Sequence, residues 1–403
     1  MPPDSPLRLA IVAGHPVQYI SPWLSRLARH PDLSLKVFYL WDLGVSAAAD
    51  PGFGRAVQWD IPMLEGYEHQ FSRNRASQPG NENFFGYINP DLPQQLAAWE
   101  PDAILLMNYA FFTYIALLLD PRFWRLPFLF RGDSHNLGRR ADLRSRISAA
   151  LRALIFSRFA AFLVAGDANR AYYRSSGVPA SKLFMGRHAV DNTRFRLASE
   201  TATGQARTLR HVLGINDETV ILFVGKFVPV KRPLDLLEAF ALLPPERRSG
   251  ARLVYVGDGP LRQTLVARAA ELGLSGVEIL PFQNQSRMPT IYSLGDLLVL
   301  PSQSETWGLV VNEAMNLDCP AVVSDHVGCG HDLVLHGETG WVFPTGDVRA
   351  LARCLQEALE DPERLRRIGR QAGVHVARFS YDGITDSLVQ ALRFSLRRRP
   401  AAG

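Results

Sequence analysis

Short, continuously apolar segments alternate with amphipathic helical patterns along this chain, and this alternation limits the fold more than any other feature. Apolar runs of about four to eight residues are typical of strands that a parallel sheet buries on both faces. In the first half of the chain such runs lie at residues 7–13, 33–40, 102–107, 127–130, 160–165 and 182–185. In the second half they lie at residues 219–225, 252–257, 277–281, 296–301, 320–324 and 340–344.

A polar stretch, residues 196–217, separates the two series of runs, and we expect it to lack regular structure. Two successive series of alternating strands and helices predict an α/β protein with two Rossmann-like, doubly wound domains that face a cleft. We place the first domain at residues 1–196 and the second at residues 215–379. The amphipathic tail, residues 380–403, predicts a helix that returns to the first domain.

The composition is that of a folded globular protein, since 47% of the 403 residues are hydrophobic and 21% are charged. The net charge of +5 allows contact with anionic substrates or a lipid surface, but no motif for binding nucleic acid accompanies it. We therefore expect no nucleic-acid partner. The apolar segment at residues 103–119 is short for a membrane span and contains Asn108, so we expect a strand, a turn and a core helix there.

The features that bear on location favour the cytoplasm. Residues 1–14 lack the pattern of a secretory signal, and three cysteines give no disulfide framework; these are Cys319, Cys329 and Cys354. An arginine-rich helical stretch at residues 139–163 is of the kind that can lie on lipid headgroups. It would allow peripheral contact with the inner face of a membrane, and a solvated helix face is the alternative.

Two glutamates, Glu305 and Glu313, lie within the segment SETWGLVVNEAM. Glu305 belongs to a turn after the strand at 296–301, and Glu313 lies inside the helix that we expect next. Their spacing corresponds to about 12 Å along a helix, which resembles the distance between the ends of a nucleotide-diphosphate sugar. Glu305 would then accept hydrogen bonds from sugar hydroxyls, and Glu313 from ribose hydroxyls. Alternatively, Glu305 is a helix-dipole residue and Glu313 a surface charge.

Ligands of doubly wound sheets bind beyond the C-terminal ends of the strands, where these glutamates lie. We expect positive charge at the same place. The first amides of the helix would point toward a diphosphate there; they belong to Gly308, Leu309 and Val310. Lys226 and Lys231 lie in a second strand-to-helix loop on the same side, where they would neutralise a leaving diphosphate. Either lysine alone is more commonly a solvated surface residue.

Four motifs in the second domain carry a family resemblance. GKFVPVKRP, VYVGDGP, LVLPSQSETWGLVVNEAM and HGETGWVFPTGD, in this order, resemble the retaining glycosyltransferases of family 4, which have the GT-B fold. The resemblance covers about residues 219–378 and implies that the E-x7-E motif falls on Glu305 and Glu313. It also implies that Lys226 and Lys231 hold the donor phosphates, that Lys226, Lys231 and Glu305 act in catalysis, and that no metal is bound.

The first domain resembles this family less specifically. In AGHPVQYISPW, Gly14 would approach the donor phosphates, and the residues after it would face the acceptor; these are His15, Gln18 and Tyr19. The family has a histidine in its catalytic region directly after a strand of this domain. Here that position falls on Arg131 or on His135 of FLFRGDSHNLGRR, with Asp133 nearby on the acceptor side.

One further segment resembles part of the family. GRHAVDNTRF, residues 186–195, corresponds to a segment NGVD, but has His188 and Ala189 in place of the asparagine and glycine. The backbone near Phe282 and Gln283 would contact the base of the donor.

The segment DHVGCGHDLVLH contains candidate zinc ligands, namely His326, Cys329, His331 and His336. Their spacings fit no common structural site, and the family has a glycine-rich donor loop in this position. We therefore read Gly328 and Gly330 as points of backbone access and expect no metal.

Together these features predict an enzyme that moves a sugar from a nucleotide-diphosphate sugar to an acceptor hydroxyl, with retained anomeric configuration and no cofactor besides the donor. The acceptor would be a saccharide, a lipid-linked glycan or a natural product in glycan or glycoconjugate biosynthesis. The alternatives are a non-catalytic nucleotide-sugar-binding protein or a GT-B epimerase. A further alternative, a membrane-surface adaptor, has only the stretch at 139–163 in its support.

Overall fold

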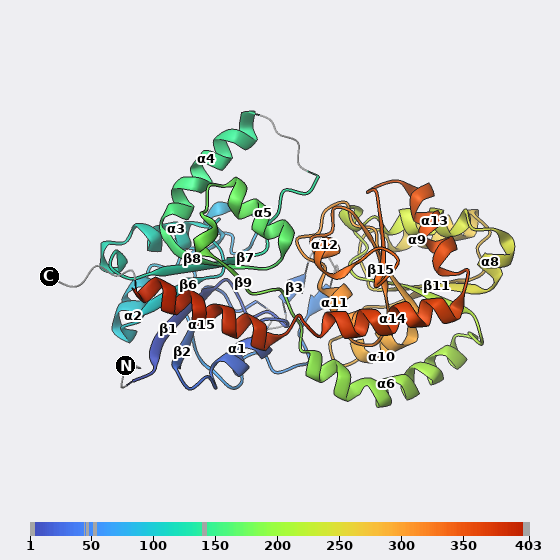
Figure 1. Ribbon diagram of the computed structural model, residues 1–403, viewed down its shortest axis with the longest axis horizontal. Helices are drawn as coiled ribbons and strands as arrows, with labels where there is room; N and C mark the ends of the chain where they lie inside the picture. The colour runs from blue at the N-terminus through green and yellow to red at the C-terminus, as the bar shows by residue number, and fades with distance from the viewer. Residues whose placement is uncertain (1–4, 44, 46–47, 51–54, 139–142, 398–403) are drawn as a thin grey trace.

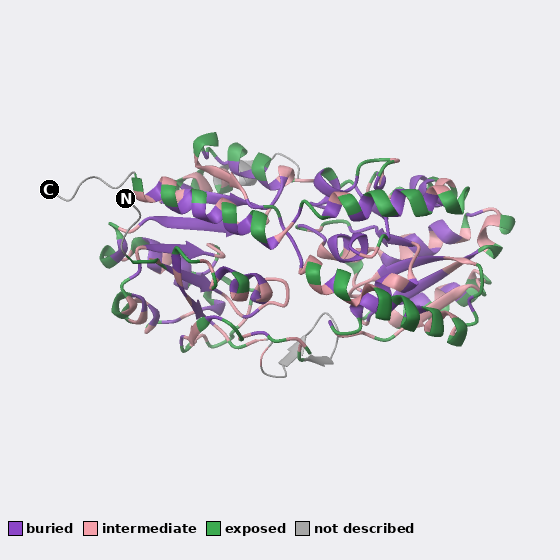
Figure 2. Ribbon diagram, turned by 60° about the horizontal axis from the view of Figure 1, so that its bottom comes forward, coloured by how far each residue is buried: buried purple, intermediate pink, exposed green. Residues whose placement is uncertain are grey.

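The computed structural model describes residues 5–43, 45, 48–50, 55–138 and 143–397 of the chain. Two parallel sheets lie side by side along the longest axis of the molecule, and helices cover both faces of each sheet (Figure 1). The central strands are buried, and the outer sides of the helices are exposed (Figure 2). The predicted α/β fold class, with two Rossmann-like domains, is confirmed.

The sheet of the first domain has the strand order β5-β2-β1-β6-β7-β8-β9, with every neighbouring pair parallel. Its strands are β1 (Leu7–Ala13), β2 (Leu33–Tyr39), β5 (Glu68–Phe71), β6 (Ala103–Leu106), β7 (Phe128–Gly132), β8 (Phe159–Val164) and β9 (Leu183–Met185). A separate antiparallel hairpin consists of β3 (Ala48–Asp50) and β4 (Arg55–Val57).

The sheet of the second domain has the order β12-β11-β10-β13-β14-β15, again with parallel neighbours. Its strands are β10 (Thr219–Val224), β11 (Ala251–Val256), β12 (Val277–Leu280), β13 (Leu297–Leu300), β14 (Ala321–Ser324) and β15 (Gly340–Phe343). In both sheets the chain order reverses beside the first strand, which brings the loops after β1 and β10 to the switch points where ligands of such sheets bind.

Helices connect the strands of both sheets. Those of the first part of the chain are α1 (Ser21–Leu27), α2 (Leu92–Trp99), α3 (Phe112–Leu119), α4 (Leu143–Ser157), α5 (Asp167–Ser175) and α6 (Asn192–Val212), with the 3-10 turns η1 (Phe84–Gly86), η2 (Pro121–Phe123) and η3 (Ala180–Lys182). Those of the second part are η4 (Pro229–Lys231), α7 (Pro233–Ala241), α8 (Pro245–Ser249), α9 (Arg262–Glu271), α10 (Met288–Leu294), α11 (Leu309–Met315), α12 (Gly330–Leu333), α13 (Val348–Ala358), α14 (Pro362–Val376) and α15 (Tyr381–Arg397).

Each predicted apolar run forms a strand whose ends lie within two residues of the expected ones. Strand β5 was not predicted, because its sequence EHQF is polar and it lies at the edge of the sheet, where burial is partial. The expectation of irregular structure at residues 196–217 is wrong, because most of this stretch belongs to the 21-residue helix α6. The Asp191 carboxylate accepts a hydrogen bond from the Arg194 amide at the start of α6, and Phe195, Ala202 and Ala206 form its buried side.

Helix α15 lies against the first sheet and crosses back from the second domain (Figure 1). It packs on α1, β8 and β9, and its side chains Ile384, Leu388 and Leu392 join the same core cluster as Ile11 and Val37. The two segments that cross between the domains are tied together, because the Asn192 side chain donates a hydrogen bond to the Phe379 carbonyl at 2.8 Å.

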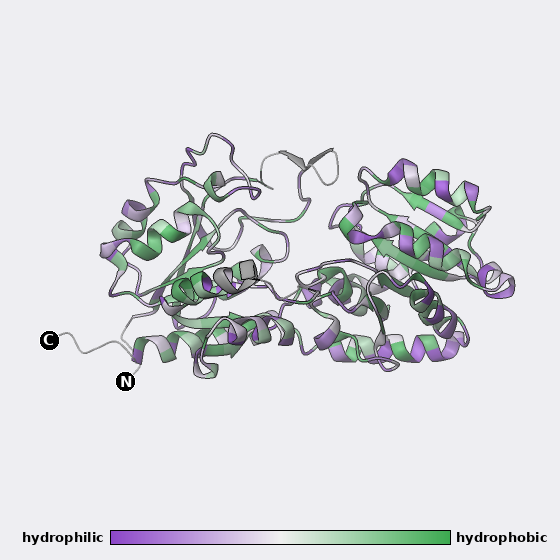
Figure 3. Ribbon diagram, turned by 90° about the horizontal axis from the view of Figure 1, so that it is seen from above, coloured by the Kyte–Doolittle hydropathy of each residue, from purple (hydrophilic) through white to green (hydrophobic). Residues whose placement is uncertain are grey.

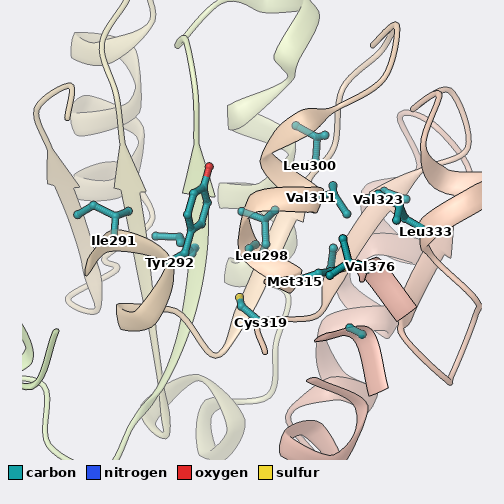
Figure 4. Close-up of a cluster of buried hydrophobic side chains, with 14 of the residues drawn as sticks. Ile291, Tyr292, Leu298, Leu300, Val311, Met315, Cys319, Val323, Leu333 and Val376 are labelled. Carbon is teal, nitrogen blue, oxygen red and sulfur yellow. The ribbon is translucent and has the colours of Figure 1, made fainter. Parts of the chain in front are cut away.

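One of the two core clusters of the second domain lies between the sheet and helices α10, α11 and α14. Figure 4 shows Tyr292 of α10 and Met315 of α11 around Leu298 of β13, all of them buried. Figure 3 shows the same pattern in the whole chain, with hydrophobic strands inside and mixed polar and apolar helices outside. This packing fixes the N-terminal end of α11 beside the C-terminal end of β13.

The apolar segment at 103–119 forms strand β6, a turn and helix α3, as predicted. Within the described part of the chain, every helix is too short or too polar to cross a bilayer.

Candidate active site

A cavity of about 420 Å³, here called the large cavity, opens between the C-terminal edges of the two sheets. Residues of both domains line it: Gln18, Tyr19, Trp59, Asp133, His188, Val224, Gly225, Lys226, Lys231, Val256, Gly257, Phe282, Gln283, Gln285, Met288, Tyr292, Glu305, Thr306, Trp307, Gly308, Leu309, Val310 and Glu313. The structure therefore brings the two predicted glutamates, both lysines, Phe282 and the start of α11 to one wall.

A second, small cavity of about 270 Å³ lies in the first domain next to the large one. Its walls are Ala13, Gly14, His15, Val17, Tyr19, Ile20, Asn81, Tyr87, Met107, Asn108, Tyr114, Arg131, Gly132, Asp133 and His188. Tyr19, Asp133 and His188 line both cavities. These three side chains therefore mark the junction where a group in one cavity would meet a group in the other.

Glu313 is a buried wall residue of the large cavity, with 8% of its surface exposed. The hydroxyl of Tyr292 donates a hydrogen bond to its Oε2 at 2.6 Å. Burial raises the pKa of Glu313, while Tyr292, the Arg194 charge and Gln285 act in the opposite direction. The alternative in which Glu313 is a surface charge is wrong, because α11 turns this side of the helix toward the cavity and the core.

Glu305 forms an ion pair, between its Oε2 and Nζ of Lys231, with the last residue of η4. Both side chains are mostly buried, with 17% and 24% exposed. Burial, followed by the neighbouring charge of Lys226, lowers the pKa of Lys231 to about 8; the Glu305 carboxylate acts in the opposite direction. Two ammonium groups, Lys226 and Lys231, thus lie beside the Glu305 carboxylate on the wall, where they can contact an anionic ligand.

Gly308 allows the turn that carries Glu305 to lie close to the start of α11. Its φ of 98° lies in the left-handed region, and a Cβ there would lie 2.9 Å from Cδ2 of Leu300. Leu309 and Val310 follow it along the cavity wall. Any side chain at position 308 would push the turn of Glu305 away from the start of the helix.

Asp133, His188 and Arg131 form a connected group at the junction of the two cavities. Arg131, which is 2% exposed, donates from Nη2 to Nδ1 of His188 at 3.4 Å and from Nη1 to the Gly186 carbonyl at 2.8 Å. Because Nδ1 of His188 accepts, its Nε2 carries the hydrogen and faces Oδ2 of Asp133 at 3.8 Å.

The charge states of this group follow from its surroundings. Burial lowers the pKa of His188, so its imidazole is neutral at pH 7. Burial also lowers the pKa of Arg131, to about 10. Burial would raise the pKa of Asp133, but interactions with His188 and Thr306 outweigh it and lower the value to about 2. At neutral pH the junction therefore presents one carboxylate and one neutral imidazole N–H.

His135 supports the Glu305 turn from behind. Its Nε2 donates to the Glu305 carbonyl at 2.7 Å, and its Nδ1 accepts from the Leu137 amide at 3.1 Å. His135 does not line either cavity among the described residues. The catalytic role expected from the sequence stays a prediction, and the contact that the structure shows is with the backbone of Glu305.

The residues predicted after β1 divide between the two cavities. Gln18 lines the large cavity, Tyr19 lines both, and His15 lines the small one, where burial lowers its pKa to about 4. Gly14, which we expected to approach the donor phosphates, lies on the small cavity, and a Cβ there would lie 2.9 Å from Oη of Tyr87. The turn after β1 brings Gly14 close to Tyr87, and its approach to the donor phosphates stays a prediction.

Hydrogen bonds join the domains across one edge of the large cavity. The Asn284 side chain donates to the Gln58 carbonyl at 2.7 Å, and the Asp60 carboxylate accepts from the amide (3.0 Å) and the hydroxyl of Ser286. Trp59, between them, lies 6.3 Å from Phe282, measured between ring centroids. Sequence reasoning missed this loop because Trp59 follows no strand of the main sheet.

No group of three or more His, Cys, Asp or Glu side chains is arranged as metal ligands, as far as the structure describes the chain. In the histidine-rich segment, Nδ1 of His326 is hydrogen-bonded to the Gln303 carbonyl, and Cys329 is buried in the core of the second domain. Gly328 lies against the Thr306 carbonyl, where a Cβ would lie 2.0 Å away, so that this glycine allows the Glu305 turn to pack closely.

Comparison with known proteins agrees with this architecture. Residues 205–374 match the family of glycosyl transferases group 1. HepE from Anabaena, in a crystal structure with UDP and glucose, superimposes with a TM-score of 0.71 at 18% identity and covers 96% of this chain and 99% of its own. Sucrose-phosphate synthase from Thermosynechococcus elongatus gives a TM-score of 0.70 at 20% identity, covering 96% and 98%. The chain has the GT-B fold.

Sequence relatives match about half of the chain. D-inositol 3-phosphate glycosyltransferase from Gordonia bronchialis is 34% identical over 198 residues, which are 47% of this chain and 43% of the relative. Alpha-D-kanosaminyltransferase from Streptomyces kanamyceticus is 33% identical over 187 residues, which are 46% and 48% of the two chains. The chain thus spans less than half the length of the curated relatives it matches.

Proposed function

We propose that this protein is a glycosyltransferase that moves a sugar from a nucleotide-diphosphate sugar to an acceptor hydroxyl with retention of the anomeric configuration. The observation that carries the proposal is the convergence of Glu305, Glu313, Lys226 and Lys231 on one cavity between two Rossmann-like domains. The names of the sequence relatives and the UDP and glucose bound to HepE support the same class of reaction.

The donor would lie along the second-domain wall. Glu313, held by Tyr292, would accept hydrogen bonds from the ribose hydroxyls, and Lys226 and Lys231 would contact the diphosphate. The planar base would contact Phe282 and Trp59, whose rings both line the cavity. Glu305, which the His135 contact holds in place through its backbone, would bind hydroxyls of the transferred sugar.

The acceptor would enter from the small cavity and reach the sugar at Tyr19, Asp133 and His188. The His188 N–H can donate to a hydroxyl oxygen there, and the Asp133 carboxylate can accept a hydroxyl proton in a hydrogen bond. These two groups would orient the attacking hydroxyl. Because His188 is neutral and Asp133 is held ionised, neither needs to change its charge on binding.

In the proposed mechanism the leaving diphosphate takes the proton of the acceptor hydroxyl as the glycosidic bond breaks on the same face. Lys226 and Lys231 would stabilise the charge that grows on the bridging oxygen, which is the contribution that a metal ion makes in other transferases. We therefore infer that transfer needs no metal.

One experiment tests reaction class, stereochemistry and metal independence together. The protein is incubated in EDTA with nucleotide sugars and candidate acceptors, and the first-formed product is analysed by NMR. We expect transfer with the donor's anomeric configuration. An inverted anomer would contradict the mechanism, activity that returns only with Mg²⁺ would contradict the role of the lysines, and donor binding without any turnover would identify a binding protein.

A further inference from the structure

An exposed apolar stripe runs along the outer side of α3 in the first domain. Thr113, Tyr114, Leu117 and Leu118 form the buried side of this helix. The opposite side carries Phe112, Ile115, Ala116 and Leu119, whose spacing places them on one face. Phe112 is 40% and Leu119 is 68% exposed. A surface helix ordinarily has polar residues on its outer face, but α3 has no charged residue at all.

Both ends of the stripe continue onto neighbouring elements. At the N-terminal end, the exposed rings of Phe84 and Phe85 lie 6.3 and 5.8 Å from the ring of Phe112, measured between centroids. At the C-terminal end, Trp124 is 63% exposed, and its Nε1 donates to the Leu119 carbonyl at 3.2 Å. Contiguous exposed apolar surface of this kind marks an interaction site. We name it the α3 stripe: Phe84, Phe85, Phe112, Ile115, Leu119 and Trp124.

Basic residues accompany the stripe. Trp124 lies between Arg122 and Arg125 in the sequence, and both arginines are exposed. Arg158, just after α4, donates to the carbonyls of Leu118 at 3.3 Å and Phe123 at 3.1 Å, and so ties α4 to this region. The acidic residues nearest in sequence are Asp120, which pairs with Arg122, and Glu82.

Helix α4 also combines basic residues with exposed apolar side chains. Its sequence LRSRISAALRALIFS contains arginines and no acidic residue, and Leu151 and Leu154 are 59% and 69% exposed. Residues 139–142 of the arginine-rich stretch noted in the sequence lie outside the described residues. Tryptophan and leucine beside arginine suit the boundary between anionic lipid headgroups and acyl chains, because the apolar groups enter the acyl region while the guanidinium groups stay at the headgroups.

The stripe adjoins the small cavity. Asn81 and Tyr87, which line that cavity, lie on either side of Phe84 and Phe85 in one short loop. The ring of Phe111, next to Phe112, lies 4.7 Å from the ring of Tyr87. A lipid surface on the stripe would therefore lie directly beside the cavity that the acceptor is proposed to enter.

We propose that the α3 stripe docks the protein onto an anionic lipid bilayer, and that the small cavity takes the hydroxyl-bearing headgroup of a lipid-linked acceptor. The second part rests on the proposed function. A second copy of the chain is a poorer occupant, because two copies packed stripe to stripe would bring the same arginines face to face.

Co-sedimentation with vesicles tests the docking. The full chain is mixed with phosphatidylcholine vesicles that contain or lack phosphatidylglycerol, at low and high salt. We expect binding to the anionic vesicles that weakens in high salt. The variant Phe85→Ser/Leu119→Ser/Trp124→Ser should lose at least about tenfold in vesicle affinity, since it removes three apolar side chains that would be buried in the acyl region.

A matched control carries Leu242→Ser and Val266→Ser, which are 55% and 54% exposed on the second domain. It should bind vesicles as the unmodified chain does, and both variants should keep their nucleotide affinity and melting temperature. Equal vesicle binding by the stripe variant and the control, or no vesicle binding at all, would overturn the docking. So would a concentration-dependent dimer, seen by light scattering, that the stripe variant loses.

The two proposals fail in different ways. Vesicle binding through the stripe without any sugar transfer would leave the docking surface in place and refute the proposed function. Transfer to water-soluble acceptors only, with no gain from lipid-linked acceptors in bound vesicles, would refute the lipid-linked acceptor and leave the transferase intact.

Discussion

Replacing Glu313 by glutamine separates nucleotide binding from folding. The side chain is buried and keeps nearly the same shape, so that Glu313→Gln removes the charge without leaving a cavity. A hydrogen bond to a charged group contributes about 1.5–3 kcal/mol, which corresponds to a loss of about 10- to 150-fold in affinity for a nucleoside diphosphate. Isothermal titration calorimetry with the free nucleotide measures this loss directly.

The same substitution should not lower stability when no nucleotide is present. Burial raises the pKa of Glu313 above its usual 4.5, so the folded state binds the proton more tightly than the unfolded state. The stability contributed by this group is therefore present at low pH and is lost as the pH rises through the folded-state pKa. Above the folded-state pKa the ionised carboxylate destabilises the empty fold, and there the melting temperature of Glu313→Gln should equal or exceed that of the unmodified chain.

The pH dependence gives a further check. Nucleotide affinity should fall as the pH drops through the raised pKa of Glu313, and Glu313→Gln should lack this part of the decline. Tyr292→Phe removes a hydrogen bond that lowers this pKa, so its affinity should decline at a higher pH. Unchanged affinity in Glu313→Gln, or an identical pH profile in the unmodified chain and the glutamine variant, would refute the assignment of Glu313 to the ribose.

Substitutions at four further residues test the other walls of the cavity. Glu305→Gln should spare nucleotide binding and reduce transfer at least about tenfold; reduced nucleotide affinity with normal turnover would reverse the two glutamates. Lys231→Ala and Lys226→Ala should each lower kcat more than donor affinity, and equal losses of kcat and affinity would indicate simple phosphate anchoring. Because the pKa of Lys231 is about 8, kcat of the unmodified chain should fall above that pH. Lys231→Arg should move this fall in kcat to a higher pH. His188→Ala should raise the acceptor KM and lower kcat without changing donor affinity. His188→Asn keeps an N–H donor and should restore part of the acceptor KM and of kcat. A general loss of stability in both variants would contradict a role at the junction.

The sequence predicted the strands well because each is a continuous apolar run, and a buried parallel strand needs nothing else. It did not predict β5, whose residues EHQF are polar because an edge strand is only partly buried. It also misread α6, where Ser, Thr and Gly residues suggested a loop although alanines at helical spacing form a buried side against α10.

The site was predictable where a motif is local in the chain, as for Glu305 and Glu313. His188 and Trp59 were missed because their roles depend on partners far away in the sequence: Arg131 and Asp133 in one case, Phe282 in the other. The contact that His135 makes was not predictable for the same reason, since the carbonyl belongs to a residue 170 positions later. One signal for His188 was available, namely that it replaces an asparagine of the related motif.

The return of α15 to the first sheet has a consequence for how the chain is made. The first domain takes Ile384, Leu388 and Leu392 into its core, and these residues leave the ribosome only after the whole second domain. A nascent chain that has reached residue 376 has a complete second sheet but an open apolar surface where α15 will lie on β8 and β9. The second domain therefore finishes folding before the first one, and chaperones that recognise exposed apolar surface would find it on the domain that was synthesised first.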